Sequence, residues 1–321
     1  MSAALRTPPG PPSLPSPPGL LGMLPPLRGR VVPAAPLGPG TWFRVGGPAE
    51  ALVRPADTED LAAFLAALPP EIPLTVIGAA SNLIIRDGGI AGVVIRLAAR
   101  GFGAIVVEAD GVVAGAAALD VTVAEHAAQA GLAGLEFLSG IPGTIGGAVA
   151  MNAGAYGGDV AAVLDWAEVV SRSGEIRRLS AGELSLAYRF SALPPGAVVV
   201  RARFAARRGE PAAIAGRIAA IRSAREATQP VRARTGGSTF ANPPGMKAWE
   251  LIAAAGCRGR GRGGAVVSDK HCNFLINTGT ATAADLEGLG EEVRAEVRAA
   301  TGVALEWEIR RLGLPSSEPG R

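Results

Sequence analysis

The sequence predicts an α+β protein, and three observations support this fold class. Short apolar runs bounded by turn residues recur along the 321 residues and read as buried strands. Two pairs of such runs flank Asp110–Gly111 and Ser173–Gly174, which are typical hairpin turns. Longer helical patterns separate other strands, as crossover connections do. Hairpins and crossovers together argue against a single doubly wound parallel sheet.

The first elements lie between residues 51 and 97. We expect a strand at 51–54 and a helix that Asp57 or Thr58 caps and that continues to Leu68. Glu59 and Asp60 lie in its first turn, where acidic groups favour the helix dipole. Apolar runs at 74–77 and 93–97 read as buried strands.

The remaining elements alternate in the same way, with a boundary near 207–211. The expected strands are 105–108, 112–114, 167–171, 176–179, 198–204, 265–267, 274–277 and 304–310. The expected helices are 121–130, 211–227, 246–255 and 283–300.

Composition restricts the class of protein. Seven prolines lie between Pro8 and Pro18, so we expect 1–22 to be a disordered tail, with a second short tail at 314–321. No apolar run reaches the ~18 residues of a membrane span, and the start lacks the apolar core of a secretory signal. A net charge of +3 gives no reason to expect a nucleic-acid or membrane partner. Cys257 and Cys272 read as reduced thiols of a cytoplasmic protein.

The run from Leu138 to Gly158 is rich in glycine, and core packing alone does not call for so few side chains. We expect the backbone here to turn sharply or to approach a ligand closely. Consecutive N–H groups in such a loop can form an anion site that suits a pyrophosphate. Its glycines are Gly140, Gly143, Gly146, Gly147, Gly154, Gly157 and Gly158. The run therefore favours a nucleotide cofactor.

A second small-residue loop follows the strand predicted at 74–77, where Gly78, Ser81 and Asn82 occur. The ends of strands commonly hold phosphates, although an ordinary strand-to-turn connection fits this segment equally well. The chain has no Walker pattern. A formal GxGxxG at 259–264 has a helix before it and a strand after it, the reverse of the Rossmann order. Its arginines without aromatic residues are weak evidence for RNA binding.

Polar residues that suit catalysis are scattered. Arg189 can grip a carboxylate with two donors, and Ser238, after two glycines, can present its hydroxyl to a ligand. Glu308 lies on the polar face of an alternating strand. Taken singly, these are more often a surface arginine, a turn serine and a solvated strand face. The two histidines, His126 and His271, offer no metal pair, so we expect no metal site.

Seven segments in order resemble the UDP-N-acetylenolpyruvoylglucosamine reductase family, and they extend from about Leu24 to Gly313. They are TWFRVGGPAE from Thr41, VIGAASNLIIRDGG from Val76, GLEFLSGIPGTIGGAVAMNAGAYGG from Gly134, YRFS from Tyr188, TGGSTFANP from Thr235, VVSDKHCNFLIN from Val266 and LEWEIRRLG from Leu305.

The resemblance implies a two-subdomain FAD-binding fold of the vanillyl-alcohol-oxidase type and a C-terminal α/β substrate domain. The implied domains are 23–98, 99–208 and 209–313. The 46 residues between Arg189 and Gly236 match the family's compact subtype. FAD is implied to be non-covalent, because Cys is absent from the FAD region and His126 is its only histidine.

The resemblance also implies the reaction and its residues. NADPH reduces FAD, and the flavin then delivers hydride to C3 of UDP-N-acetylglucosamine enolpyruvate, which becomes UDP-N-acetylmuramate for peptidoglycan. Arg189 stabilises the negative charge that develops. Ser238 donates the proton to C2. Glu308 orients the carboxylate and is expected to be protonated or paired with Arg310.

The implied binding residues fall into two sets. The cofactor set is Gly78, Ala79, Ala80, Ser81, Asn82, Leu83, Ser139, Gly140, Ile141, Gly143, Thr144, Gly146, Gly147, Asn152 and Gly154. The substrate set is Tyr188, Arg225 and Asn242.

Two positions depart from the family pattern. Ala80 replaces a glycine, which we expect to require a negative φ there. Ala241 replaces a lysine and removes one possible substrate contact. We expect a monomer. The alternatives are another oxidase or dehydrogenase of the same FAD fold, or an inactive nucleotide-binding module.

Overall fold

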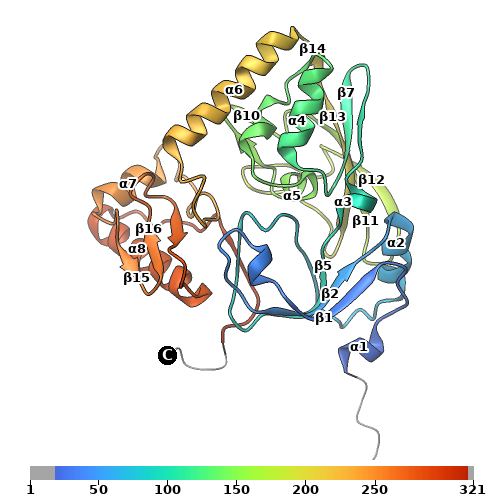
Figure 1. Cartoon of the computed structure of the whole chain (residues 1–321), viewed down its shortest axis with the longest axis horizontal. Helices are drawn as coiled ribbons and strands as arrows, with labels where there is room; N and C mark the ends of the chain where they lie inside the picture. Colours follow the sequence, from blue (N-terminus) through green and yellow to red (C-terminus); the bar gives the residue numbers. More distant parts are fainter. Residues whose placement is uncertain (1–18, 317–321) are drawn as a thin grey trace, which may run out of the picture.

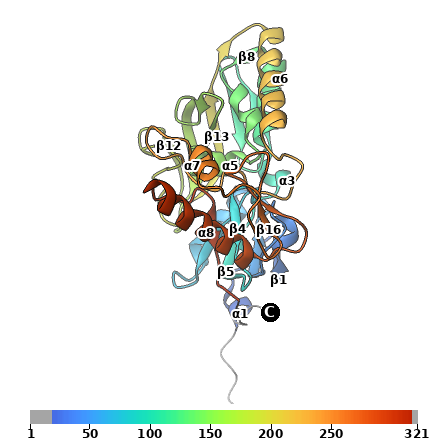
Figure 2. The same ribbon diagram turned by 90° about the vertical axis from the view of Figure 1, so that its left-hand side faces the viewer.

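A computed structural model describes residues 19–316, which form three packed regions (Figures 1 and 2). The first is a sheet in the order β1-β2-β5-β3, with β1 antiparallel to β2 and the other pairs parallel. Its strands are β1 (Arg30–Pro36), β2 (Pro48–Arg54), β3 (Leu74–Val76) and β5 (Ile90–Ile95). The strand β3 was expected to be buried, but it lies at the sheet edge, and Val76 is 42% exposed.

The helix α2 (Thr58–Ala67) packs into the core of the first region. Asp57 caps it as predicted, because its carboxylate accepts the Asp60 N–H at 2.9 Å. The helix buries Leu61, Phe64 and Leu65, so its apolar face fixes its position. No helix among residues 19–316 is long and apolar enough to cross a membrane.

The second region is an antiparallel five-stranded sheet in the order β12-β11-β13-β7-β6. Both predicted hairpins, β6 with β7 and β11 with β12, are confirmed. The strands are β6 (Ile105–Val107), β7 (Gly111–Gly115), β11 (Leu164–Val170), β12 (Ile176–Ser180) and β13 (Val198–Ala205). The helices around it are α3 (Ala99–Phe102), α4 (Asp120–Gln129) and α6 (Pro211–Thr228).

The glycine-rich run belongs to this region and is more ordered than expected. It contains the 3-10 helix η2 (Glu136–Gly140) and the helix α5 (Ile145–Ala150). Short pairs join β9 (Gly154–Ala155) to β10 (Gly158–Asp159), and β8 (Leu132–Ala133) to β14 (Arg207–Arg208).

The third region follows α6, which runs along one side of the molecule towards it (Figure 1). Its elements are α7 (Ala248–Ala254), β15 (Gly261–Arg262), β16 (Ala265–Val267), β17 (Leu275–Asn277) and α8 (Ala283–Thr301). Phe43, Val45 and Ile84 of the first region complete its core. Packing therefore joins the two regions, while the proposed domain boundaries stay predictions.

The end of the chain returns to the first region. The strand β18 (Arg310–Leu312) pairs in parallel with β4 (Leu83–Ile85). The strand predicted at 304–310 was therefore mostly wrong, since only an isolated bridge between Phe240 and Trp307 precedes β18. Leu305 and Ile309 are nevertheless buried, as the predicted alternation requires.

The two predicted tails extend less far than expected. Helix α1 (Leu20–Met23) begins inside the 1–22 segment, and Leu20 packs against the core of the first region. Residues 1–18 lie outside the described part of the chain. At the other end, the Leu314 N–H donates to Gly89 O at 2.9 Å, so the fold continues past 313. A short 3-10 helix, η1 (Gly38–Gly40), precedes β2.

Candidate active site

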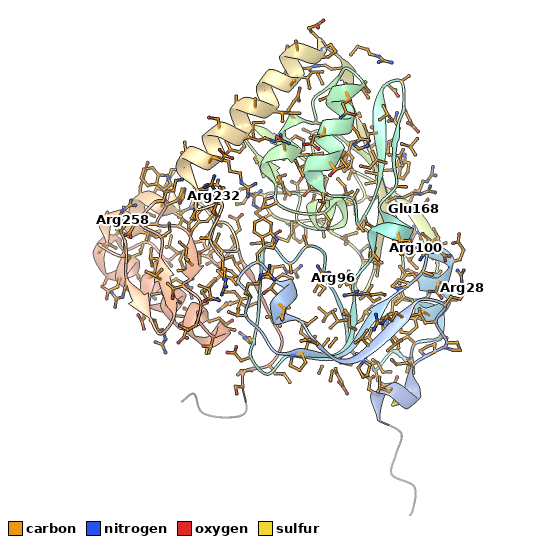
Figure 3. The ribbon with its side chains drawn as sticks, viewed as in Figure 1. Arg28, Arg96, Arg100, Glu168, Arg232 and Arg258 are labelled. Carbon is orange, nitrogen blue, oxygen red and sulfur yellow. The ribbon has the colours of Figure 1, made fainter. Side chains whose placement is uncertain are left out.

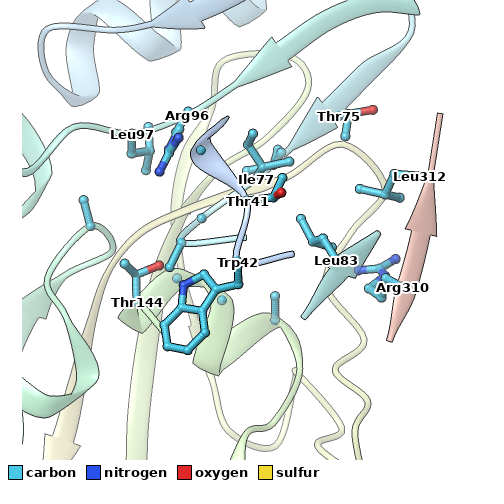
Figure 4. Close-up of a pocket in the computed structure, with 18 of the residues that line it drawn as sticks. Thr41, Trp42, Thr75, Ile77, Leu83, Arg96, Leu97, Thr144, Arg310 and Leu312 are labelled. Carbon is cyan, nitrogen blue, oxygen red and sulfur yellow. The ribbon is translucent and has the colours of Figure 1, made fainter. Parts of the chain in front are cut away.

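Two cavities that share a wall lie where the three regions meet. The larger has a volume of about 1560 Å³ and the smaller about 290 Å³. Trp42, Gly78 and Thr144 line both. In the larger cavity, Arg310 and Leu312 come from β18, beside the strand that carries Leu83 (Figure 4). A ligand in one cavity can therefore reach a ligand in the other.

The loop after β3 forms part of both cavities. Gly78 is required by a close approach, because a Cβ there would lie 2.7 Å from Thr144 Oγ1. The expectation of a negative φ at Ala80 was wrong: φ is +52° and the residue is buried. Ser81, Asn82 and Leu83 line the smaller cavity, as expected for this loop.

Several glycines of the 138–158 run serve internal packing, which corrects the expectation that packing could not explain them. A Cβ on Gly140 would lie 2.7 Å from the Tyr156 ring, and one on Gly158 would lie 2.8 Å from the Phe137 ring. On Gly146 it would lie 3.0 Å from the Ala116 Cβ. These glycines hold the loop against its own region.

Only part of the run is free to face a ligand. The N–H groups of Ile145 and Gly146 donate to Ala118 O and Ala116 O at 3.0 and 2.9 Å, so a continuous cradle of N–H groups is not formed. Gly147 differs, because it lines both cavities and a Cβ there would meet nothing closer than 3.9 Å.

Arg189 and Glu308 form an ion pair in the smaller cavity. Arg189 Nε donates to Glu308 Oε1 at 2.6 Å, and Arg189 Nη2 donates to Gly154 O at 3.2 Å. The expected pairing of Glu308 with Arg310 was wrong, because Arg189 occupies its carboxylate. Arg310 forms no ion pair with any residue of the 19–316 segment. The Arg189 guanidinium is thereby held in place with donors to spare.

Ser238 lines the same cavity and is tied to Glu308 through backbone bonds. The next residue, Thr239, accepts the N–H groups of Glu308 and Ile309 at 2.9 and 3.3 Å. The Asn82 side chain donates to Glu308 O at 3.1 Å. The cofactor loop, the serine and the ion pair are therefore positioned by one hydrogen-bonded frame.

Strained backbone concentrates at these cavities. Seven non-glycine residues of the 19–316 segment have positive φ, and four of them line a cavity. The four are Arg44, Ala80, Tyr156 and Arg189. Such conformations cost energy and gather at functional sites, where surrounding contacts hold them.

Four of the expected binding residues lie outside both cavities. The Ser139 hydroxyl donates to Glu136 O at 2.7 Å, and the Asn152 side chain bonds Ala187 O and the Ala161 N–H. Asn242 Oδ1 accepts the Ala248 N–H at the start of α7. The hydrogen bonds of these three side chains therefore stabilise the fold.

The fourth, Tyr188, is 59% exposed, and the centre of its ring lies 5.0 Å from the Arg189 guanidinium. Burial of part of the side chain and the charge of Glu308 raise the pKa of its hydroxyl.

Arg225 does reach the smaller cavity from the last turn of α6. Burial lowers the pKa of its guanidinium, and Tyr156 offsets this in part. A buried cation of this kind is stabilised by an anionic ligand.

The sequence alone did not reveal several lining residues. Trp42 lies within the quoted TWFRVGG segment but was given no role. No sequence pattern identified Asp120 as a site residue, since its neighbours are apolar. Figure 3 shows Arg96 near the middle of the molecule and Arg232 beside the third region.

The larger cavity has the positive charge that suits the phosphates of a dinucleotide. Arg96, Arg232, Arg234 and Arg310 line it, and none forms an ion pair within the described part of the chain. Burial and the neighbouring Arg54 lower the pKa of Arg96. Unpaired arginines and the open backbone at Gly147 fit a diphosphate ligand such as FAD.

Comparison with known proteins agrees with this geometry. Residues 49–180 match the FAD binding domain family, and 229–312 match the C-terminal domain of UDP-N-acetylenolpyruvoylglucosamine reductase. The UDP-N-acetylenolpyruvoylglucosamine reductase of Acidiphilium cryptum is 70% identical over 91% of this chain and 94% of its own. The enzyme of that name from Granulibacter bethesdensis is 66% identical, with coverage of 91% and 94%.

A solved structure extends the likeness to three dimensions. The crystal structure of UDP-N-acetylenolpyruvylglucosamine reductase from Thermus caldophilus superposes with a TM-score of 0.77 at 37% identity, over 89% of this chain and 100% of that one. The resemblance seen in the seven segments is confirmed, and so is the expected fold class. The chain belongs to the UDP-N-acetylenolpyruvoylglucosamine reductase family, with the FAD-binding domain and the C-terminal domain of that family.

Proposed function

We propose that this chain reduces the enolpyruvyl group of UDP-N-acetylglucosamine enolpyruvate to give UDP-N-acetylmuramate, with FAD in the larger cavity and the reaction in the smaller one. Family membership supports the activity. The observation that carries the site is the convergence of Arg189, Glu308 and Ser238 on a cavity that adjoins one suited to a dinucleotide. FAD, when bound, accepts hydride from NADPH and passes it to C3 of the substrate.

Arg189 is the cation for the charge that develops on the substrate. After hydride addition at C3, negative charge spreads over C2 and the carboxylate. Fixed donors near such charge lower the barrier because they need no reorganisation. Glu308 and Gly154 O each accept one donor of Arg189, which orients the guanidinium while other N–H groups stay available.

Ser238 is the proton donor to C2. Its position at the smaller cavity and its frame of hydrogen bonds with the Glu308 segment support this role. A serine hydroxyl is a weak acid, but the carbon that it protonates is strongly basic. Arg225, a half-buried cation in the same cavity, is suited to an acidic group of the nucleotide sugar.

The two half-reactions separate these roles. Reduction of FAD by NADPH needs no proton at substrate carbon, so Ser238→Ala should bleach the flavin at close to the normal rate. Reoxidation by substrate under anaerobic conditions should slow by ~10²–10⁴-fold, the usual cost of lost general-acid assistance. Rapid-mixing absorbance measures both steps. Normal reoxidation in this variant would remove Ser238 from the mechanism.

Arg189→Ala tests the charge stabilisation. It should leave reduction by NADPH near normal and slow reoxidation, with weaker substrate binding as well. If neither half-reaction occurs in the unchanged protein although it is yellow, the alternative of an inactive flavin-binding module is correct.

We also propose that FAD is non-covalent and that the protein is a cytoplasmic monomer. His126, the only histidine of the first two regions, is exposed and lines neither cavity. Acid precipitation should release all the flavin into the supernatant, and colour in the pellet would contradict this. Sedimentation of the holoprotein tests the oligomeric state.

A further inference from the structure

Asp120 is a buried carboxyl group without a partner at the smaller cavity. It is the first residue of α4, its exposed fraction is 0%, and it lines that cavity. Neither carboxyl oxygen has a hydrogen-bond partner among residues 19–316. Buried polar groups are almost always hydrogen-bonded, so this one calls for a partner that the chain itself does not supply.

Asp60 shows how the same fold treats a buried aspartate with a structural role. It is 5% exposed, and its oxygens accept the N–H groups of Arg28, Gly29 and Ala56 at 2.7 to 2.9 Å. Those three bonds offset the cost of burial and hold the turn before α2. Asp120 has no such bonds, so its burial is a cost that folding alone does not offset.

The surroundings of Asp120 keep space for its carboxyl group and favour its neutral form. A Cβ on Gly143 would lie 2.6 Å from Asp120 Oδ2, so glycine is required there for the carboxyl to hold its position. Burial raises the pKa of Asp120 well above its ordinary value, and no cation among the described residues pairs with it. A neutral carboxyl group has one hydrogen-bond donor and can also accept.

The sides of the cavity indicate which ligand meets this group. Asp120 and the 140–144 loop come from the second region, next to the part of the wall that both cavities share. Ser238, which suits the nucleotide sugar, comes from the third region, whereas Leu119, the neighbour of Asp120, lines the larger cavity and pairs with Thr144, which lines both. The Asp120 side is therefore the one that receives the part of the cofactor that extends from the larger cavity.

We propose that the buried, unpartnered Asp120 carboxyl group donates a hydrogen bond to the pyrimidine ring of the bound flavin, at its N1–C2=O edge. This inference rests on the proposed function only in taking the smaller cavity as the place of the flavin ring. Reduction places negative charge on that edge of a flavin. A donor there binds the reduced ring more tightly than the oxidised ring, and it thereby raises the midpoint potential.

The test compares Asp120→Leu, which has no donor, with Asp120→Asn, which keeps a donor and an acceptor in the same shape. Titration of FAD into the flavin-free full chain, followed by flavin fluorescence, gives Kd. For Asp120→Leu we expect the Kd for FAD to rise about tenfold, because one lost hydrogen bond is worth about 1.4 kcal/mol. We also expect the midpoint potential to fall, by about 30 mV if binding of the reduced ring loses a further tenfold. For Asn, both should stay close to the unchanged protein.

If Asp120 had a structural role, its replacement should lower the stability of the flavin-free chain, whereas the proposal predicts no loss of stability. Replacing an unpaired buried carboxyl by an apolar group of similar size should leave the flavin-free chain as stable or more stable. If Asp120→Leu instead lowers the melting temperature and leaves Kd and the potential unchanged, the proposal is wrong. If the Leu variant does not fold, Asp120→Ala provides the same comparison. If Asp120→Asn changes the Kd and the midpoint potential as much as Asp120→Leu does, an ionised carboxylate is needed, which also overturns the proposal.

Asp60→Leu is the matched control. It should destabilise the protein through three lost bonds, while the Kd for FAD of the folded fraction stays unchanged. If the unchanged protein binds no FAD at all, the proposed function itself is contradicted. That outcome differs from one in which FAD binds but its Kd and potential do not change when Asp120 is replaced.

Discussion

Ala80 has a φ of +52°, although a methyl group at this position makes the left-handed region unfavourable. For an L-residue this conformation costs roughly 1–2 kcal/mol, which glycine avoids. The Trp42 N–H donates to Ala80 O at 3.3 Å, and such contacts from the surrounding loop hold the residue in place. The sequence identified the departure from the family pattern. It could not give the sign of φ, because tertiary contacts decide it.

Ala80→Gly should therefore stabilise the protein. We expect the free energy of unfolding to rise by up to about 1 kcal/mol, since relief of strain exceeds the added entropy of the unfolded chain. Urea unfolding of the holoprotein measures it.

Ala79→Gly is the control, because Ala79 lies in the same loop and also lines the smaller cavity, but has no positive φ. It should give no gain, and it should lose about 0.5–1 kcal/mol if only chain entropy changes. Equal gains in both variants would mean that φ at Ala80 is not the cause.

The ion pair shows how far the family resemblance can predict a site. Arg189, Ser238 and Glu308 were identified from the sequence, and all three line one cavity. The partner of Glu308 was misassigned to Arg310, two residues away on the same polar face. Arg189 is distant in sequence, and only the fold brings its Nε to 2.6 Å from that carboxylate.

At the scale of elements, most of the longer helices and strands could be predicted from their apolar periodicity, and α2 and α8 also have side-chain caps. The 138–158 run could not, because glycine and alanine carry no periodic contrast. Its helix α5 is six residues long and is held by bonds to Ala116 and Ala118 of a distant segment. The predicted strand at 304–310 failed because its alternation reflects the burial of Leu305 and Ile309 and not a ladder of strand hydrogen bonds.

The two adjacent glycines of α5 should respond differently to the same change. Gly147→Val projects into both cavities, where the added atoms take the ligand's space. We expect the Kd for FAD to rise by at least ~10-fold, a loss of about 1.4 kcal/mol. The helix itself should be unharmed, because valine is a better helix former than glycine.

Gly146→Val serves as the comparison. Its side chain would press on Ala116 and should destabilise the fold by about 1–3 kcal/mol, as overpacking does. Thermal unfolding of both flavin-free variants, with FAD titrations, separates the effects. If Gly146→Val is as stable as the unchanged protein but no longer binds FAD, this glycine also faces the cofactor.

At the scale of the whole molecule, β18 is the strand that connects the C-terminal region back to the first. Arg86 N–H donates to Leu312 O at 2.8 Å, and Arg310 N–H donates to Asn82 O at 3.1 Å. Ending the chain at Ile309 removes these bonds and the partner of β4. At about 1 kcal/mol for each bond, plus lost packing, this is a large share of a typical total stability.

We expect a chain that ends at Ile309 to yield little soluble, flavin-containing protein. A chain that ends at Ser316 keeps every described residue and should be normal in flavin content and melting temperature. The two truncations differ by seven residues at one end, so size alone cannot explain a difference. Full flavin content in the shorter chain would show that β4 is stable without a partner.

The pairing of β4 with β18 also bears on how the molecule is made. Leu83 leaves the ribosome long before Arg310, its partner. The neighbourhood of β4, which includes the cofactor loop at residues 78–83, stays incomplete until synthesis has ended. Pairs so distant in sequence slow folding, because a long loop must close before the contact forms. An exposed strand edge invites pairing with other chains in the meantime. We therefore expect the nascent protein to need protection by chaperones, and to acquire its flavin only after release.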